Sequence, residues 1–318
     1  MEPPNRPLLA LGLRLIGAAA LAAMLALAKL SGAHGVALAE TLFWRQLLPT
    51  LLILGWLAAR GGLARLRTRR IASHARRAAI GLTCMALTLG SARLLPLAEA
   101  TVLSFTTPVF ATILAAVMLR ERVGPIRLAA VAAGFAGVLV IAGPDRGNLP
   151  LAGLATGLGA ALLQALIAIQ LRDLGRTDEP LTIVLWFSAF SSLVLLPVQP
   201  FVARPHDPTT WAILAAMGGL GLVGQLGVTA SLRHGRVSSV IVMDYSGIAW
   251  ATLWGWFAFA QLPPASTWLG APLVAAAGLT IVLREQQLAR IGRRTAADAA
   301  PATDLALPLG GGAVSDVA

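Results

Sequence analysis

Apolar runs long enough to cross a lipid bilayer follow one another along most of the chain. A transmembrane helix needs about 20 consecutive apolar residues, and ten such runs occur in the 318-residue sequence. Only 12% of the residues are charged, against roughly 25% in a soluble domain. Because the runs are continuous rather than alternating, they predict helices and disfavour a β-barrel. The expected spans are 8–30, 36–59, 77–95, 98–119, 126–143, 150–171, 181–203, 210–232, 237–260 and 266–284.

Basic residues are distributed unevenly over the segments that join these spans. With a cytoplasmic N-terminus, 19 of the 25 Lys and Arg residues fall in cytoplasmic segments, seven of them in 60–77. This bias is typical of cytoplasmic loops. The net charge of +11 therefore reports membrane topology, and we expect no nucleic-acid partner. The sequence predicts a multi-pass protein of the cell (inner) membrane with both termini in the cytoplasm.

The two ends of the chain differ from the apolar middle. Arg14 interrupts the first apolar run, and Glu2 precedes it. Both features argue against a cleaved signal peptide, so the run is treated as the first span. Residues 287–318, rich in Ala, Pro, Gly and Asp, are expected to form a disordered cytoplasmic tail. The single cysteine, Cys84, excludes a disulfide within the chain.

Residues 94–143 have a fainter copy about 140 residues later. Each copy consists of two apolar spans joined by a short turn, and an offset of 140 places Ser91 on Ser231. The ten predicted spans therefore divide into two repeats of five. Because five is an odd number, the second repeat enters the membrane from the opposite side. The sequence thus predicts an all-α membrane protein of ten transmembrane helices. They form two inverted five-helix repeats, residues 1–145 and 146–286, as in alternating-access carriers.

Several short motifs resemble those of one known family. They are Phe43-Trp44-Arg45, Leu97-Ala98-Glu99-Ala100-Thr101, Thr107-Pro108-Val109-Phe110, the turn Arg120-Glu121-Arg122, and the run 133–138. Over residues 8–284 the chain is similar to the EamA-type drug/metabolite transporters. This resemblance implies a secondary carrier of a small metabolite, and residues 95–101 look closest to bacterial carriers of S-adenosylmethionine or riboflavin. The second half departs from the pattern, with Ile248 in place of Pro108 and Gln261 in place of the turn glutamate.

Ionisable side chains inside the predicted spans are few, and each is costly in a bilayer. Arg14 and Asp244 lie at similar depth in the inner third, so we predict that they pair, or that Asp244 pairs with Arg233 or Arg236. A second candidate group lies towards the outer face and comprises Glu40, Arg45, Arg93 and Glu99. Either group of charges could contact substrate or gate a vestibule, or could simply hold helices together.

Proline and aromatic residues provide the remaining candidates. Pro108 should kink or unwind the fourth span, because proline lacks a backbone N–H and clashes with the preceding turn. Freed carbonyl oxygens there could bind substrate. The alternative that the kink only curves the helix is equally compatible with the sequence. Asp244 is followed by Tyr245 and Trp250, and a carboxylate beside aromatic faces suits a cationic or planar substrate. The other candidates for substrate binding or gating are Trp44, Ser104, Thr107, Gln164 and Gln225.

Other classes of protein have less support in the sequence. The four histidines are too scattered for a metal site, and there is no nucleotide-binding or nucleophile motif. We therefore expect no cofactor, no metal and no enzymatic activity, with transport coupled to protons or to exchange. A channel, a flippase for lipid-linked substrates, a sensory protein and a membrane enzyme stay open, because fold does not decide function. Assembly into a homodimer also stays open.

Overall fold

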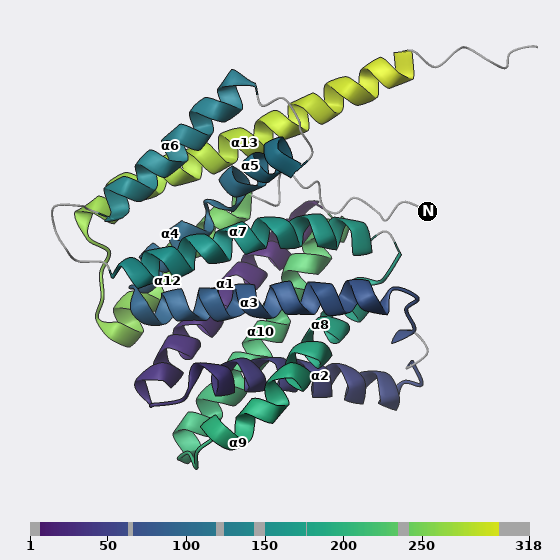
Figure 1. Cartoon of the computed structure of the whole chain (residues 1–318), viewed down its shortest axis with the longest axis vertical. Helices are drawn as coiled ribbons and strands as arrows, with labels where there is room; N and C mark the ends of the chain where they lie inside the picture. The colour runs from purple at the N-terminus through teal and green to yellow at the C-terminus, as the bar shows by residue number, and fades with distance from the viewer. Residues whose placement is uncertain are drawn as a thin grey trace, which may run out of the picture.

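The structure is a computed structural model that describes residues 7–62, 66–118, 124–142, 150–175, 177–234 and 242–298. Throughout these ranges the regular structure is helical, with no strand. Figure 1 shows the helices lying side by side in a bundle. The turn 120–122 and the expected boundary between the two repeats lie outside the described residues.

The first half of the chain contains six helices, two of which share one predicted span. They are α1 (Pro7–Ala33), α2 (Leu38–Ala59), α3 (Ile71–Leu94), α4 (Leu97–Ser104), α5 (Thr107–Met118) and α6 (Pro125–Ala142). The second half begins with α7 (Leu151–Leu174) and α8 (Pro180–Leu195), which continues through η2 (Leu196–Val198) into α9 (Gln199–Val202). It ends with α10 (Pro208–His234), η3 (Val242–Ser246), α12 (Gly247–Phe259) and α13 (Ala265–Asp298).

Within the described residues, seven helical segments are long and apolar enough to cross a membrane, and α6 is a shorter apolar helix. The described residues of each predicted span fall mainly on one helix or on consecutive helical segments, but α3 and α12 do not meet this measure of length and hydropathy. α3 begins at Ile71, six residues before the expected start of the third span. Its first turns carry His74, Arg76 and Arg77, which lower its mean hydropathy.

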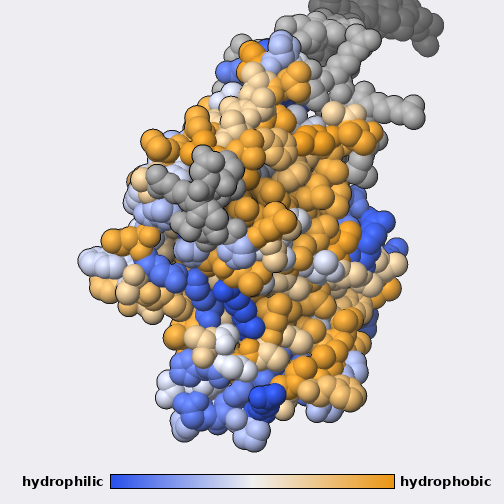
Figure 2. Space-filling view, turned by 60° about the vertical axis from the view of Figure 1, so that its left-hand side comes forward, coloured by the Kyte–Doolittle hydropathy of each residue, from blue (hydrophilic) through white to orange (hydrophobic). Residues whose placement is uncertain are grey.

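The surface of the bundle is largely apolar. Figure 2 shows hydrophobic residues over much of the visible face, with hydrophilic residues gathered mainly towards its lower end. Leu139, Leu193 and Phe257 are each more than 60% exposed. Such an extended apolar surface is not stable in water and indicates contact with lipid.

The fourth predicted span is broken at the place that proline predicted. α4 ends at Ser104 and α5 begins at Thr107. Pro108 therefore lies in the first turn of α5, where a backbone N–H would have no acceptor within the helix, so its absence costs no helical hydrogen bond. The carbonyl oxygens at the break already accept hydrogen bonds. The hydroxyl of Thr106 donates to the Leu103 oxygen at 2.6 Å, and the hydroxyl of Thr107 donates to the Ser104 oxygen at 2.7 Å. A substrate would have to compete for these oxygens.

Glycines allow the closest helix contacts. A β-carbon on Gly17 of α1 would lie 3.0 Å from the backbone nitrogen of Val228 in α10. Between α6 and α13, a β-carbon on either Gly137 or Gly270 would lie less than 3 Å from the carbonyl oxygen of the other. Backbones approach this closely in membranes only where residues are small.

The end of the chain departs from expectation. α13 continues to Asp298, so the prediction of a disordered tail is wrong for residues 287–298. This stretch is rich in Ala and Arg, which have high intrinsic helix propensity. The remainder of the predicted tail, residues 299–318, lies outside the described residues.

Ala260 closes α12 in a left-handed conformation, with φ 51° and ψ 30°. An L-residue with a β-carbon is strained there, whereas glycine is not. We expect Ala260→Gly to stabilise the protein by about 0.5–1 kcal/mol and to raise its Tm in detergent. Ala258 is exposed within the same helix, and the matched change Ala258→Gly should lower the Tm. A lower Tm for both variants would contradict the assignment of strain to Ala260.

Candidate functional site

Arg14 and Asp244 form the ion pair that the sequence predicted. The Arg14 Nε donates to Asp244 Oδ1 at 2.6 Å, and a second guanidinium nitrogen contacts Oδ2. Arg14 also donates to the carbonyl oxygen of Val228 at 3.3 Å. The two-point contact joins α1 to η3, and therefore the first half of the chain to the second. Of the alternative partners, Arg236 and the side chain of Arg233 lie outside the described residues.

The two broken spans face each other next to this pair. Tyr245, directly after Asp244, packs its ring edge-on against Phe105 with centroids 4.9 Å apart. Phe105 lies in the gap between α4 and α5. Ser104 and Thr107 flank that gap and are exposed at their hydroxyls, although each hydroxyl donates to a local carbonyl. The irregular segments of both halves thus meet in one region of the bundle.

The outer group of charges is not joined through hydrogen bonds or ion pairs among the described residues. Glu40 Oε1 lies 2.8 Å from His206 Nε2, and Glu99 accepts a hydrogen bond of 2.9 Å from Thr267. Arg93 donates to the hydroxyl of Thr41 at 2.7 Å. These side chains thus have separate partners on different helices and loops, and the outer cluster stays a prediction.

Trp44 belongs to the surroundings of Glu40. Its ring packs edge-on against Trp211 at 5.1 Å, and Trp211 in turn contacts the ring of His206 at 5.6 Å. Sequence reasoning missed the role of His206, because this residue is far from Glu40 along the chain and lies in the loop before α10.

Arg45 lines a small cavity between α2, α8 and α10. The cavity has a volume of about 10 Å³, which is room for about one water molecule. Arg45 is buried, and it donates to Gln46 Oε1 at 3.1 Å and to the sulfurs of Met24 and Met85. The cavity is lined by Arg45, Gln46, Pro49, Val184, Phe187, Ser188, Gly221, Leu222 and Gln225.

Two other predicted residues lie away from that cavity lining. Gln164 on α7 is exposed, and its side-chain oxygen is 3.5 Å from the sulfur of Cys84. Trp250 on α12 has a buried indole nitrogen with no hydrogen-bond partner among the described residues.

Arg77 is a residue that sequence reasoning missed. It was assigned to the edge of a loop, but α3 begins six residues earlier and buries its side chain to 8% exposure. Its guanidinium lies over the ring of Phe187, 4.6 Å from the centroid, and Phe187 also lines the cavity beside Arg45.

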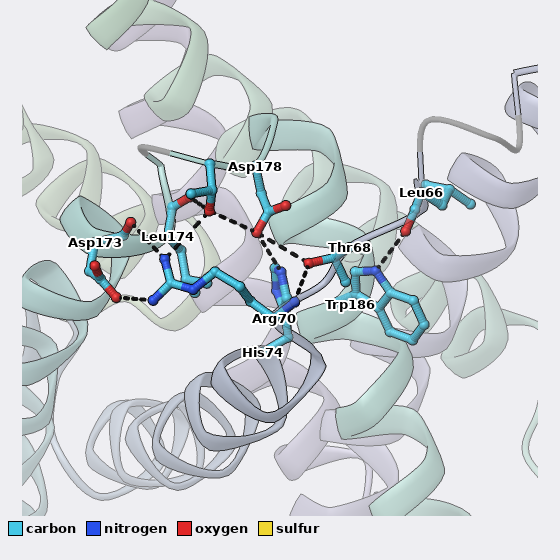
Figure 3. A network of polar contacts seen from close by, with 9 residues as sticks. Leu66, Thr68, Arg70, His74, Asp173, Leu174, Asp178 and Trp186 are labelled. Atoms are coloured by element: carbon cyan, nitrogen blue, oxygen red, sulfur yellow. Dashed lines mark hydrogen bonds and ion pairs between the residues drawn. The ribbon is translucent and has the colours of Figure 1, made fainter.

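A polar network joins the segment before α3 to the connection between α7 and α8 (Figure 3). Arg70 forms an ion pair with Asp173, and His74 Nε2 lies 3.1 Å from Asp178 Oδ2. Thr68 donates to the same Asp178 oxygen at 3.4 Å. The basic segment 60–77 was interpreted from the sequence only as a topology signal. In the structure it also connects the two halves of the chain at one end of the bundle.

Asp207 caps α10 at the opposite end. The Thr210 hydroxyl and the Thr209 backbone N–H donate to its carboxylate, and the bond from Thr210 contributes most to holding the pKa of Asp207 below its ordinary value of 3.8. A depressed pKa stabilises the fold above pH 3.8, and the effect is lost as pH falls through the folded-state pKa. We expect Asp207→Ala to lower the Tm at pH 7, and the gap from wild type to narrow at pH 3. A gap that is equal at both pH values would contradict this role.

The architecture described so far is that of a membrane transport protein: an apolar helical bundle with broken spans and a partly buried ion pair between its halves. The model of the EamA-like transporter family matches residues 8–143 and again residues 151–283. The chain belongs to this family and is a transporter rather than an enzyme.

Characterised relatives are named as transporters. The riboflavin transporter of Vibrio cholerae is 30% identical over 227 residues, covering 70% of this chain and 75% of the relative. The pseudopaline exporter CntI of Pseudomonas aeruginosa is 28% identical over 251 residues, covering 76% and 85%. One solved crystal structure aligns with a TM-score of 0.59 over 87% of this chain and 98% of the other. At 19% identity it supports the fold alone.

Proposed function

We propose that the protein is a secondary-active carrier of a small metabolite that works by alternating access between two inverted five-helix repeats, residues 1–145 and 146–286. In this proposal ten helices cross the membrane, with α4–α5, α8–α9 and η3–α12 each forming one span. Transport is coupled to protons or to exchange of solutes.

The packing of the helices is the observation that carries the proposal. The most extensive contact of α1 is with α10, and that of α7 is with α3. α2 contacts α10, and α8 contacts α3. Exchanging α1 with α7, α2 with α8, and α3 with α10 converts each of these contacts into another one. The pairs α2–α8, α4–α12 and α6–α13 are converted into themselves. Two repeats related by a pseudo-twofold axis would produce this pattern.

The distribution of charge supports one orientation. In the proposed topology the network of Figure 3 lies on the cytoplasmic side of the inner membrane, and the Glu40–His206 contact lies on the outer side. Both termini are then cytoplasmic. Polar contacts at both ends and a cavity of about 10 Å³ between α2, α8 and α10 suit an occluded conformation. In this scheme the Arg14–Asp244 pair gates the inner vestibule. A homodimer stays a prediction, which the mass of the detergent-purified protein tests.

The names of the relatives make riboflavin a reasonable first solute to test. Purified protein in liposomes preloaded with unlabelled solute should accumulate the labelled form by counterflow without ATP. A wider panel of metabolites, chosen by thermal-shift screening, follows the same protocol. Chemical conversion of the solute would favour an enzyme, and movement of lipid-linked substrates alone would favour a flippase. Protein-free liposomes and heat-unfolded protein serve as controls.

A further inference from the structure

Two buried arginines, one lining the cavity and one packed on its Phe187, have no carboxylate partner among the described residues. Arg45 is 4% exposed, and its donors reach one amide oxygen and two sulfurs. Arg77 is 8% exposed, and its Nε and one terminal nitrogen are buried without a hydrogen-bond partner among the described residues. An arginine stays charged in a protein, so two positive charges here lack a counter-ion within the described part of the chain.

Both guanidinium groups lie against α3, at positions about one helical turn apart. A β-carbon built on Gly81 would fall 2.1 Å from an Arg77 nitrogen, so the Arg77 side chain extends along α3 to the level of Gly81. Arg45 contacts Met85 on the same helix, four residues further on, which is about 6 Å along the axis. The ring of Phe187 lies under Arg77 and lines the cavity that Arg45 also lines.

The carboxylates of the described helical bundle are engaged elsewhere. Asp244 pairs with Arg14, Glu40 with His206, and Glu99 with Thr267. Among the described residues no carboxylate forms an ion pair with Arg45 or Arg77, so a bound anion would supply a counter-charge that this part of the chain does not. Leaving buried charged donors unpaired is costly, and a bound anion with several acceptor oxygens would remove that cost.

We propose that Arg45 and Arg77 form an anion-binding site and that the carried metabolite has a carboxylate or phosphate group. The inference rests on the proposed transport function and names the substrate class of that cavity. The anionic group accepts hydrogen bonds from both guanidinium groups, whose planar donor arrangement matches carboxylate and phosphate oxygens. The uncharged part of the metabolite lies against Phe187, near Gln46, Ser188 and Gln225.

The cavity must enlarge to admit such a molecule. Pro49 of α2 and Gly221 of α10 line it, and proline and glycine are positions at which membrane helices bend. A β-carbon on Gly221 would be 3.7 Å from Arg45 Nε and from Met24. Movement of α2 away from α10 would therefore uncover Arg45 directly.

Binding can be measured without any transport step. The full-length protein is purified in an uncharged detergent, and its thermal unfolding is followed with sodium phosphate, citrate and succinate at constant ionic strength set with chloride. We expect saturable stabilisation by at least one of the organic or phosphate anions. Arg77→Gln and Arg45→Gln should each weaken the apparent affinity at least tenfold. Arg77→Lys, which keeps the charge but loses the planar arrangement of donors, should weaken it less.

Arg76 supplies a matched control. It is adjacent to Arg77 but exposed, so Arg76→Gln removes the same charge from the protein and should leave the affinity unchanged. Equal stabilisation of wild type, Arg76→Gln and Arg77→Gln would overturn the proposal, as would stabilisation by neutral or cationic metabolites alone. Counterflow of a neutral solute with no anion binding would reject the anion site while supporting the carrier function. If Arg77→Gln does not fold, the Arg77→Lys and Arg45→Gln variants decide the outcome.

Discussion

Replacing Asp244 with asparagine is expected to reduce the transport rate at least tenfold and to lower the Tm. The change removes the charge that the buried Arg14 guanidinium contacts at two points while keeping the size of the side chain. Losing hydrogen bonds to a charged group costs about 1.5–3 kcal/mol. The lower part of that range applies, because the Asp244 side chain is 39% exposed. Counterflow in liposomes and thermal unfolding of the purified protein measure the two effects.

A charge exchange separates gating from stability. The double variant Arg14→Asp with Asp244→Arg restores an ion pair, and we expect it to recover more of the Tm than either single change retains. If Asp244→Asn leaves both the transport rate and its proton dependence unchanged, the pair has no role in gating or coupling. Asp173→Asn, at the end of the Figure 3 network, is a useful comparison because its carboxylate is more exposed.

Introducing leucine at Gly17 is expected to have the largest effect on folding. The new side chain would meet the backbone of Gly224, Gly227 and Val228 in α10 at 3.0–3.3 Å, and backbone atoms cannot move aside as a side-chain end can. Overpacking in a well-packed interior costs about 1–3 kcal/mol and sometimes more. We expect a Tm at least several degrees below wild type and a smaller yield of monodisperse protein on gel filtration.

Gly12 provides the control on the same helix. A β-carbon there meets nothing within 4 Å, so Gly12→Leu should leave the Tm close to that of wild type. Leucine favours a helix more than glycine does, so comparable losses for Gly12→Leu and Gly17→Leu would mean that the α1–α10 contact does not determine the result.

Sequence reasoning was most successful where the physical constraint is local or set by the bilayer. Apolar runs near residues 8–30 and 36–59 became α1 and α2, and Pro108 broke its span as expected. The pairing of Arg14 with Asp244 was predictable because two opposite charges at similar depth in a bilayer have few other partners.

The failures concern side chains whose environment depends on the whole bundle. Arg77 was assigned to a loop because arginine usually marks the end of a membrane span, whereas here Phe187 on another helix covers it. Glu40 and Glu99 were grouped by depth alone, yet His206 and Thr267 reach them separately. No local pattern encodes these contacts, since they depend on how distant helices rotate about their axes.

The contact of α1 with α10 also has a consequence for biosynthesis. Gly17 meets Gly227, so roughly 200 further residues must be made before α1 can pack as it does in the folded protein. At about 5–20 residues per second, α1 waits on the order of 10–40 s for its partner. Throughout that interval Arg14 lies in or beside the bilayer without Asp244. α1 is synthesised early, yet the charge of its Arg14 is paired late. Until Asp244 is in place, the insertion of α1 depends on lipid and the insertion machinery.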